Sequence, residues 1–361
     1  MKNGCVGLSK NVSNILYGFA ILQMVWGHLF LFEEKVPGWI SLATIHGISI
    51  ERIISVSFSC VSIFAFITGY GMCKKMESQN NFSGGEYSYK EIIINNVKYS
   101  IKKYISLMKQ VWLVFIIFIP IGIIFFDKKW EFRELILNFW GISSSINKEW
   151  WYIRFYICLL LMFPLLDIIY TISKIIIKNE KMIIISIIFL IAVGILYKNT
   201  RSLFCFGSYI VFISGYLCAR FKIFDNLKVN KITLAISVIA IIVLLISKCV
   251  MLFYLGLDQK YDKFMDAYTI PVLICAIVVL YTQTKNSMFW IVISFFGRHS
   301  SYIWLTHTFF CYYYLQRIII MPKYSVLVFS FTLFLATISA LALEWLQKKM
   351  TRVICEFSRR K

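Results

Sequence analysis

The sequence is poor in charged residues, in proline and in histidine. Only 16% of its 361 residues are charged, five are proline and four are histidine, whereas an ordinary soluble domain has about 25% charged residues. A disordered chain carries more charge and less apolar surface than this. A single soluble core could not hide so many apolar residues. These shortages exclude a disordered chain and a typical cytosolic enzyme.

The chain also lacks paired cysteines. Its ten cysteines are scattered, and no two of them form a Cys-x-x-Cys pair, so the sequence supports neither a zinc ribbon nor a redox motif. Most of them fall inside apolar runs, where cysteine behaves as a small hydrophobe. We therefore expect no metal site, and the spacing excludes a small disulfide scaffold.

Apolar runs dominate the rest of the sequence. Hydrophobic residues make up 59% of the chain and the mean hydropathy is +0.73, and a helix needs about 20 apolar residues to cross a bilayer. The pattern predicts an all-α polytopic membrane protein that forms a single membrane domain over residues 1–361. Ten spans are expected, at residues 12–32, 51–73, 110–126, 150–173, 182–197, 203–219, 232–253, 267–284, 300–320 and 325–345.

The first of these runs also resembles a signal peptide, because Lys2 and Lys10 precede it. However, the run 12–32 is too long for the apolar region of a signal peptide, has no clear cleavage site and is followed by further spans. We interpret it as the first transmembrane helix.

The net charge of +20 has two readings. A strongly basic protein can bind nucleic acid or an anionic surface, but membrane proteins also concentrate Lys and Arg on their cytoplasmic side. With the N-terminus inside and ten alternating spans, the inner segments hold 24 of the 38 Lys and Arg residues. The asymmetry favours cytoplasmic termini, a cytoplasmic segment at 74–109, and membrane lipid rather than nucleic acid as a partner.

Ionisable residues inside a bilayer are costly, and each is a candidate functional site. In the first span, Tyr17 and His28 are 11 residues apart, which places them on one helix face about 16 Å apart. A neutral histidine at depth can accept and return a proton near pH 7, although a packing role is also possible. Six side chains of this kind within the predicted spans are singled out: His28, Arg154, Asp167, Lys248, His307 and Glu344.

The ninth span carries the second intramembrane histidine. Ser300, His307 and Tyr314 are seven residues apart and share a helix face. Arg298 and His299 precede this span and are expected at the inner surface, where an anionic ligand would meet them. The alternative for Arg298 is a simple positive-inside anchor.

Two further segments combine small or aromatic residues. Residues 64–71, Phe-Ala-Phe-Ile-Thr-Gly-Tyr-Gly, contain small residues that allow close helix contact. Trp150-Trp151-Tyr152 opens the fourth span, and Arg154 follows about one turn inside. An interfacial aromatic belt and a snorkelling arginine account for this pattern, and the same ring faces also suit sugar stacking.

These segments, in this order, resemble the acyltransferase-3 family of integral membrane acyltransferases. The family's first helix carries Arg, Gly and then His; Gly18 and His28 match, and Tyr17 stands at the Arg position. Residues 64–70 are similar to its Phe-Phe-x-x-Ser-Gly-Phe/Tyr motif. Trp151-Tyr152-Ile153 through Pro164 are similar to its Trp-Tyr/Phe-Leu pattern, and Gly297 through His307 to its Gly-x-x-Ser-Tyr-x-Ile-Tyr-Leu-x-His motif. No fused extracellular esterase-like domain is recognised.

The resemblance implies transfer of an acyl group, acetyl in the first instance, from cytosolic acyl-CoA to a hydroxyl of a cell-surface or exported glycan. It implies His28 and His307 as catalytic residues. The expected substrate-binding residues are Tyr17, Thr68, Gly69, Tyr70, Trp151, Tyr152 and Arg154, and those expected at the acyl-CoA are Arg298, His299 and Ser300.

Two other functions remain open on the sequence, and both also belong in the cell membrane. Intramembrane Arg154, Lys248 and histidines suit a transporter or flippase for a lipid-linked glycan or small anion, although no inverted repeat is visible. An assembly scaffold of the same pathway is the third possibility. Only the transferase requires His28 for turnover.

Overall fold

The computed structural model describes residues 8–32, 34–56, 59–82, 89–177, 203–254 and 259–359. The chain divides into two compact units, and each is assembled from segments that are distant in sequence. Unit 1 comprises Met1–Leu8, Val61–Ile105 and Phe155–Gln283, and unit 2 comprises Ser9–Cys60, Ser106–Arg154 and Thr284–Lys361.

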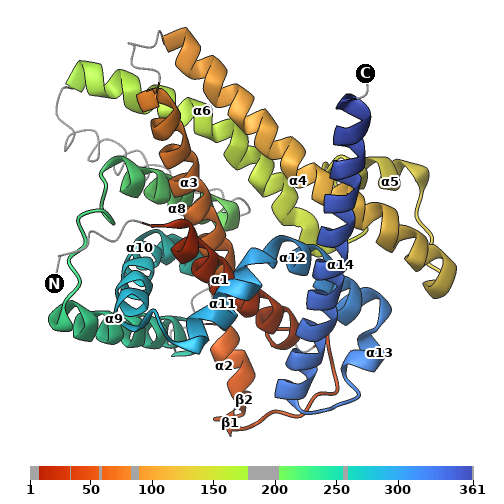
Figure 1. Cartoon of the computed structure of the whole chain (residues 1–361). Helices are drawn as coiled ribbons and strands as arrows, with labels where there is room; N and C mark the ends of the chain where they lie inside the picture. The colour runs from red at the N-terminus through yellow and green to blue at the C-terminus, as the bar shows by residue number, and fades with distance from the viewer. Residues whose placement is uncertain are drawn as a thin grey trace. The chain divides into compact units, whose positions relative to one another are not determined.

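The described residues are mostly helical, which confirms the all-α class (Figure 1). Within the described ranges, six helical segments are long and apolar enough to cross a membrane, as expected for a polytopic membrane protein. They are Ile50–Ser78, Glu91–Phe126, Lys148–Thr171, Lys231–Cys249, Met265–Thr284 and Ser325–Glu356. Each overlaps one of the ten spans predicted from the sequence.

The other four predicted spans have different outcomes. Residues 12–32 and 203–219 correspond to the helices α1 (Lys10–Phe30) and α8 (Leu203–Arg220), which are not among the six. The predicted span 182–197 lies outside the described residues. The span 300–320 is not one continuous helix, and its division shapes the site below.

The segment 74–109, expected as the longest cytoplasmic connection, is helical over most of its described length. Helix α3 (Cys60–Phe82) continues past the predicted end of its span, and α4 (Tyr89–Phe126) begins 21 residues before the predicted start of the next. Hydropathy does not detect these extensions, because lysines and asparagines interrupt the apolar residues without stopping the helix.

In unit 1, α3 and α8 cross at very short range. A Cβ atom added to Gly69 would overlap the backbone of Phe212, and one added to Gly215 would overlap the backbone of Phe66. Glycine is therefore required on both helices for this crossing. The remaining elements of unit 1 are the part of α4 before Ser106, most of α6 (Trp151–Ile177), α9 (Lys231–Cys249), the π-helical turn η2 (Val250–Tyr254) and most of α10 (Gln259–Thr284).

Two ion pairs are buried in unit 1. Asp167 of α6 accepts hydrogen bonds from Arg220 and from the Tyr216 hydroxyl of α8, the latter at 2.6 Å. Lys248 of α9 lies 2.7 Å from Asp266 of α10, and Asp266 also accepts a bond from Ser62 at 2.5 Å. Two of the ionisable residues predicted inside the spans are thus charge-paired, as the low dielectric requires.

Unit 2 is organised by the crossing of α1 with α11 (Met288–Arg298) (Figure 1). A Cβ on Gly18 would overlap the backbone of Ile293, and one on Gly297 would overlap the backbone of Asn14. The two glycines lie on facing sides of one contact. The short apolar segment 287–296 forms most of α11, with Ser287 as its N-cap.

The predicted ninth span is divided into α12 (Ser300–Thr308), the π-helical turn η3 (Phe309–Tyr314) and α13 (Gln316–Ile319). The expectation of a single continuous helix is wrong. Within η3 the aromatic side chains have separate partners: Phe309 packs edge-on against Trp150, and Tyr314 stacks on Phe126. A π-helix has a wider turn than an α-helix, so its side chains point in different directions. Hydropathy does not predict where such a turn occurs.

A hydrogen-bond network around one buried carboxylate links the segments of unit 2 that follow α1. The carboxylate of Glu51, in α2 (Ile50–Val56), is fully buried and accepts hydrogen bonds from the Leu42 backbone and from the hydroxyls of Ser41 and Ser325. It joins the loop that precedes the hairpin of β1 (Thr44–Ile45) and β2 (Ile48–Ser49) to the start of α14 (Ser325–Arg359). The other elements of this unit are α5 (Phe132–Phe139) and the 3-10 turn η1 (Lys148–Trp150).

Candidate active site

The two histidines expected to be catalytic meet in unit 2. His28 lies in the last turn of α1 and His307 in the last turn of α12. The distance from His28 Nδ1 to His307 Nε2 is 2.7 Å, and the two rings are within 5° of parallel. This is a direct hydrogen bond between imidazoles.

The backbone carbonyls near His307 indicate which ring nitrogens of the two histidines carry hydrogen. His307 Nδ1 lies 2.9 Å from the backbone oxygens of both Ile303 and Trp304. A carbonyl only accepts, so Nδ1 of His307 carries a hydrogen, and in the neutral ring Nε2 is left as an acceptor. His28 Nδ1 then donates to it. The lone pair of neutral His28 is therefore on Nε2, on the opposite side from His307.

A carboxylate faces that nitrogen. Glu149 Oε2 lies 3.4 Å from His28 Nε2, and its other oxygen lies 3.0 Å from Lys35 Nζ. A proton taken up by His28 Nε2 would create an imidazolium beside this negative charge. Glu149 would stabilise that positive charge as it forms.

The turn that carries Glu149 is fixed to the helix of His307. Asn147 caps η1 by accepting from the Glu149 backbone at 3.2 Å, and its amide donates to Thr308 at 2.8 Å. The Trp150 indole donates to the Leu305 carbonyl at 3.2 Å. These bonds hold Glu149 beside α12 rather than leaving it free in an external loop.

The π-helical turn secures the histidine of the other helix. The Tyr312 hydroxyl donates to the backbone oxygen of His28 at 2.5 Å. The Tyr312 ring also lies 5.2 Å from Lys35 Nζ, close enough for a cation–π contact. Because η3 begins two residues after His307, the same short segment positions both histidines.

Access differs between the two rings. The side chain of His28 is 20% exposed and that of Glu149 is 13% exposed, whereas His307 is fully buried. A substrate hydroxyl can therefore reach His28, and His307 acts on it only through the ring of His28. The geometry suits general base catalysis by a positioned histidine.

Four of the predicted substrate-binding residues lie in unit 2. Tyr152 is buried with its ring edge-on against Trp304 at 5.4 Å, and Trp151 is half-buried. Arg154 is exposed, with its guanidinium 3.5 Å from the Ser144 hydroxyl. Tyr17 is half-buried on α1, about three turns from His28. Among these, Tyr17, Trp151 and Arg154 present accessible surface.

The other three predicted substrate-binding residues lie in unit 1. Gly69 is at the close crossing of α3 with α8. The Thr68 hydroxyl donates to the Phe64 carbonyl within its own helix, and Tyr70 is buried against Phe224. Each therefore has a packing role in unit 1.

The residues expected at the acyl-CoA cluster where α11 meets α12. Arg298 is exposed and Ser300 is buried at the start of α12. His299 Nδ1 lies 2.8 Å from Glu344 of α14. His299 and His307 are eight residues apart, which corresponds to about 12 Å along the axis of α12.

Sequence reasoning missed Glu149, Asn147 and Tyr312. Glu149 had a usable signal, since it is an acid directly before an aromatic run at a membrane boundary. Asn147 and Tyr312 had no sequence signal of a functional role, because an asparagine in a loop and a tyrosine in an aromatic cluster are both common. Glu344, noted only as an intramembrane charge, is the partner of His299.

Comparison with known proteins agrees with the resemblance drawn from the sequence motifs. A family model described as an acyltransferase domain, that of the acyltransferase-3 family, matches residues 13–345. No curated protein matches, and no solved structure does either. The matched range includes both histidines and Glu149.

Proposed function

Because this chain belongs to the acyltransferase-3 family of membrane acyltransferases, we propose that it moves an acyl group, acetyl in the first instance, from acyl-CoA to a glycan hydroxyl. One observation carries the proposal. An accessible His28 is hydrogen-bonded at 2.7 Å to a buried His307 and faces the carboxylate of Glu149 at 3.4 Å. This arrangement has a base, a group that orients it and a counter-charge.

The reaction follows from these roles. The acceptor hydroxyl approaches His28 Nε2, which takes its proton as the oxygen attacks the thioester carbonyl carbon. A carbon–oxygen bond forms, the carbon–sulfur bond breaks, and the CoA thiolate leaves and recovers a proton from His28. Glu149 stabilises the imidazolium that exists in between, and His307 keeps the His28 ring in the reactive tautomer.

The junction of α11 with α12 is the proposed site for the donor. Arg298 is exposed there and offers a cation to the phosphates of CoA. Glu344 beside His299 limits the positive charge at this end, so Arg298 is expected to contribute more binding energy than His299. Acyl-CoA is an extended molecule, and its thioester would lie toward His28 while its phosphates remain at Arg298.

The acceptor is proposed to be a cell-surface or exported glycan, and the enzyme to be a multi-pass protein of the cell membrane. Trp151 is half-buried in the first turn of α6, close in sequence to Glu149, and an aromatic ring of this kind suits sugar stacking. Arg154, one turn further on, is exposed and can donate to sugar hydroxyls.

The test combines donor binding with turnover. In purified protein, thermal unfolding is followed with acetyl-CoA, succinyl-CoA and free CoA, since a ligand of the folded state raises the midpoint. A specific rise that Arg298→Ala weakens supports the donor site. Release of CoA that depends on a glycan acceptor, and that His28→Gln abolishes, supports the transferase.

The matched control is His46→Asn. His46 is exposed in the hairpin turn with a φ of 50°, a conformation that asparagine tolerates, and the substitution should leave turnover unchanged. A folded protein that binds no thioester, or that transfers equally well without His28, contradicts the proposal and favours the transporter.

A further inference from the structure

Three lysines of unit 1 lie together without an acidic partner. Lys75 is on α3, and Lys102 and Lys103 are neighbours on α4. The charges that act on the Lys103 ammonium are those of the other two lysines, both positive. Among the residues that the structure describes, none of the three forms an ion pair. We call these three residues the lysine cluster.

The acids on neighbouring helices of unit 1 are engaged by other cations. Glu77 follows Lys75 by two residues on α3, but its carboxylate lies 3.4 Å from Arg220. Asp225 lies 2.9 Å from Lys74. Like charges that are left together repel one another, so the lysine cluster lacks a counter-charge that the described part of the protein does not supply.

One member of the cluster is held in place. Lys103 is half-buried, and its Nζ lies 5.6 Å from the centroid of the Tyr99 ring, which is a cation–π distance. Lys75 and Lys102 are exposed and therefore accessible to a ligand. The cluster thus combines one positioned cation with two that can close on a bound anion.

A buried hydroxyl lies on the same side of α4 as Lys103. Ser100 is only 7% exposed, and its hydroxyl has no hydrogen-bond partner. It precedes Lys103 by three residues, a spacing that makes two side chains neighbours on a helix face. A buried hydroxyl without a partner is destabilising, and a ligand oxygen that accepts from Ser100 would remove that cost.

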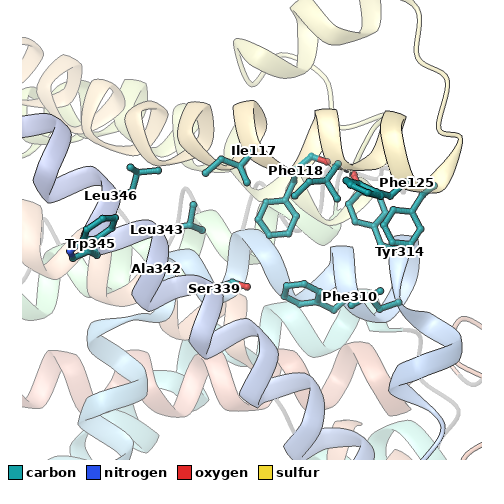
Figure 2. A pocket seen from close by; sticks show the side chains of 13 residues that line it. Ile117, Phe118, Phe125, Phe310, Tyr314, Ser339, Ala342, Leu343, Trp345 and Leu346 are labelled. Atoms are coloured by element: carbon teal, nitrogen blue, oxygen red, sulfur yellow. Dashed lines mark hydrogen bonds between the residues drawn. The ribbon is translucent and has the colours of Figure 1, made fainter.

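The pocket between α4 and α14 in unit 2 has the opposite character (Figure 2). None of the residues that line it is charged, and Figure 2 shows mainly aromatic and aliphatic side chains. Such a lining cannot compensate the desolvation of an anion. An anionic ligand is matched instead by the lysine cluster.

The length of α4 carries the cluster out of the hydrocarbon. The spanning segment Glu91–Phe126 has 36 residues, which is about 54 Å of helix, against a hydrocarbon core of about 30 Å. All lysines of this segment precede Gln110. Its lysine-bearing part therefore lies at or beyond the membrane surface, where phosphate groups of lipids and of soluble molecules both occur.

We propose that the lysine cluster and the Ser100 hydroxyl bind a phosphate group. The ammonium groups supply the counter-charge and the hydroxyl donates to a phosphate oxygen, the combination that charge-assisted hydrogen bonds favour. The phosphate belongs either to a soluble phosphate ester or to an anionic lipid headgroup. This site is in unit 1, whereas the donor site proposed at Arg298 is in unit 2, so neither depends on the other.

The experiment is thermal unfolding of the full-length protein in a neutral detergent. It uses the Arg298→Ala variant, so that the proposed donor site does not contribute. The soluble probe is inorganic pyrophosphate, compared with chloride at equal ionic strength. The lipid probe is phosphatidylglycerol, compared with phosphatidylcholine. Binding should raise the unfolding midpoint by a few degrees, and the rise should shrink at high salt because salt screens the charges.

Two substitutions distinguish a ligand site from a structural role. Lys103→Gln removes a cation and Ser100→Ala removes the unpaired hydroxyl, and each should abolish most of the rise. Neither should lower the midpoint without ligand, because each removes a repulsive or unsatisfied group. A structural residue would show the reverse: a lower midpoint and an unchanged rise. The control is Lys231→Gln, which makes the same charge change at an exposed residue of α9 in unit 1 and should retain the rise.

The probes identify the source of the phosphate. A rise with pyrophosphate that Lys103→Gln removes supports a soluble phosphate ester, and such a rise with phosphatidylglycerol alone supports a lipid headgroup. Folded protein that responds to neither probe would overturn the inference. Equal loss of the rise in Lys103→Gln and Lys231→Gln would also overturn it, since only the net charge would then matter. Turnover is not measured, so failure of the proposed function leaves this test intact.

Discussion

His28 and His307 are 279 residues apart in the chain, and yet His28 Nδ1 lies 2.7 Å from His307 Nε2. Each histidine is in the last turn of its own helix, and the crossing of α1 with α11 helps to bring those two helices together. In this pair His28 has an accessible ring nitrogen, whereas His307 is fully buried and contacts only the protein. This division predicts different consequences for changing each residue.

Replacing His307 with Gln should lower kcat while leaving the KM for acyl-CoA nearly unchanged. Gln offers an oxygen acceptor to His28 Nδ1 but does not reproduce the rigid ring held by Ile303 and Trp304. Loss of a positioned base lowers the rate by about 10²–10⁴-fold. We expect His28→Gln to show a loss near the upper end of this range, and His307→Gln to show a smaller loss. Steady-state kinetics and the pH profile of kcat distinguish the two variants.

The control for this pair is His299→Gln, which alters a histidine outside the catalytic pair. His299 contacts Glu344 at the proposed donor end, so its loss should change KM for acyl-CoA more than kcat. If His307→Gln raised KM and left kcat intact, the assignment of His307 to positioning His28 would be wrong.

Replacing Glu149 with Gln should slow the chemical step without unfolding the protein. The substitution keeps the size of the side chain and removes the charge that faces His28 Nε2 at 3.4 Å. Hydrogen bonds to charged groups contribute about 1.5–3 kcal/mol, which corresponds to a loss of about 10- to 100-fold in kcat. The measurement is the rate of CoA release at saturating donor.

Glu34→Gln is the matched control for Glu149, since Glu34 is an exposed acid close to Lys35 in sequence. It should leave the rate within error of the parent protein. Equal effects of the two substitutions would show that only the general negative potential of this surface matters.

Replacing Gly18 with Ala should destabilise unit 2. The added Cβ would overlap the backbone of Ile293 on α11, and backbone cannot rotate away as a side chain can. Overpacking of this kind costs about 1–3 kcal/mol. The midpoint of thermal unfolding should fall, and activity should fall with it because α1 carries His28.

Gly27→Ala on the same helix is the comparison. No atom lies within 4 Å of a Cβ at Gly27, and alanine is the better helix former, so this variant should be as stable as the parent or slightly more stable. A Gly18→Ala protein as stable as Gly27→Ala would contradict the close crossing of α1 with α11.

Replacing Arg220 with Met should strongly destabilise unit 1. Asp167 is 1% exposed and Arg220 is its cationic partner, and removing one member of a buried pair costs about 3–5 kcal/mol. The midpoint of unfolding should fall by several degrees or more. The double variant with Asp167→Leu should recover much of the loss, because it leaves no unpaired charge. Failure of the double variant to recover would show that the Tyr216 and Asn96 bonds to Asp167 matter more than its charge.

The helical membrane class was predictable because hydropathy depends only on local composition. Long apolar runs such as 325–345 appear in the structure as spanning helices, and α14 extends further because its last turns are amphipathic. The division of 300–320 was not predictable in this way. It depends on the separate partners of Phe309, Tyr312 and Tyr314, which come from other parts of the chain.

The candidate site was predictable in its residue types and not in its grouping. His28 and His307 stood out because ionisable groups in apolar helices are rare. Glu149 did not stand out, since an acid in an external loop is ordinary until its turn is pinned by Asn147 and Trp150.

The sequence by itself determined that this chain is a helical membrane protein with two histidines in its apolar segments, because burial cost and helical period are local properties. Only the tertiary structure decided that the two rings share a hydrogen bond, that Glu149 faces one of them, and that Gly18 and Gly297 serve one crossing. These relationships join residues far apart in the chain, and they exist only when helix packing brings them within a few ångströms.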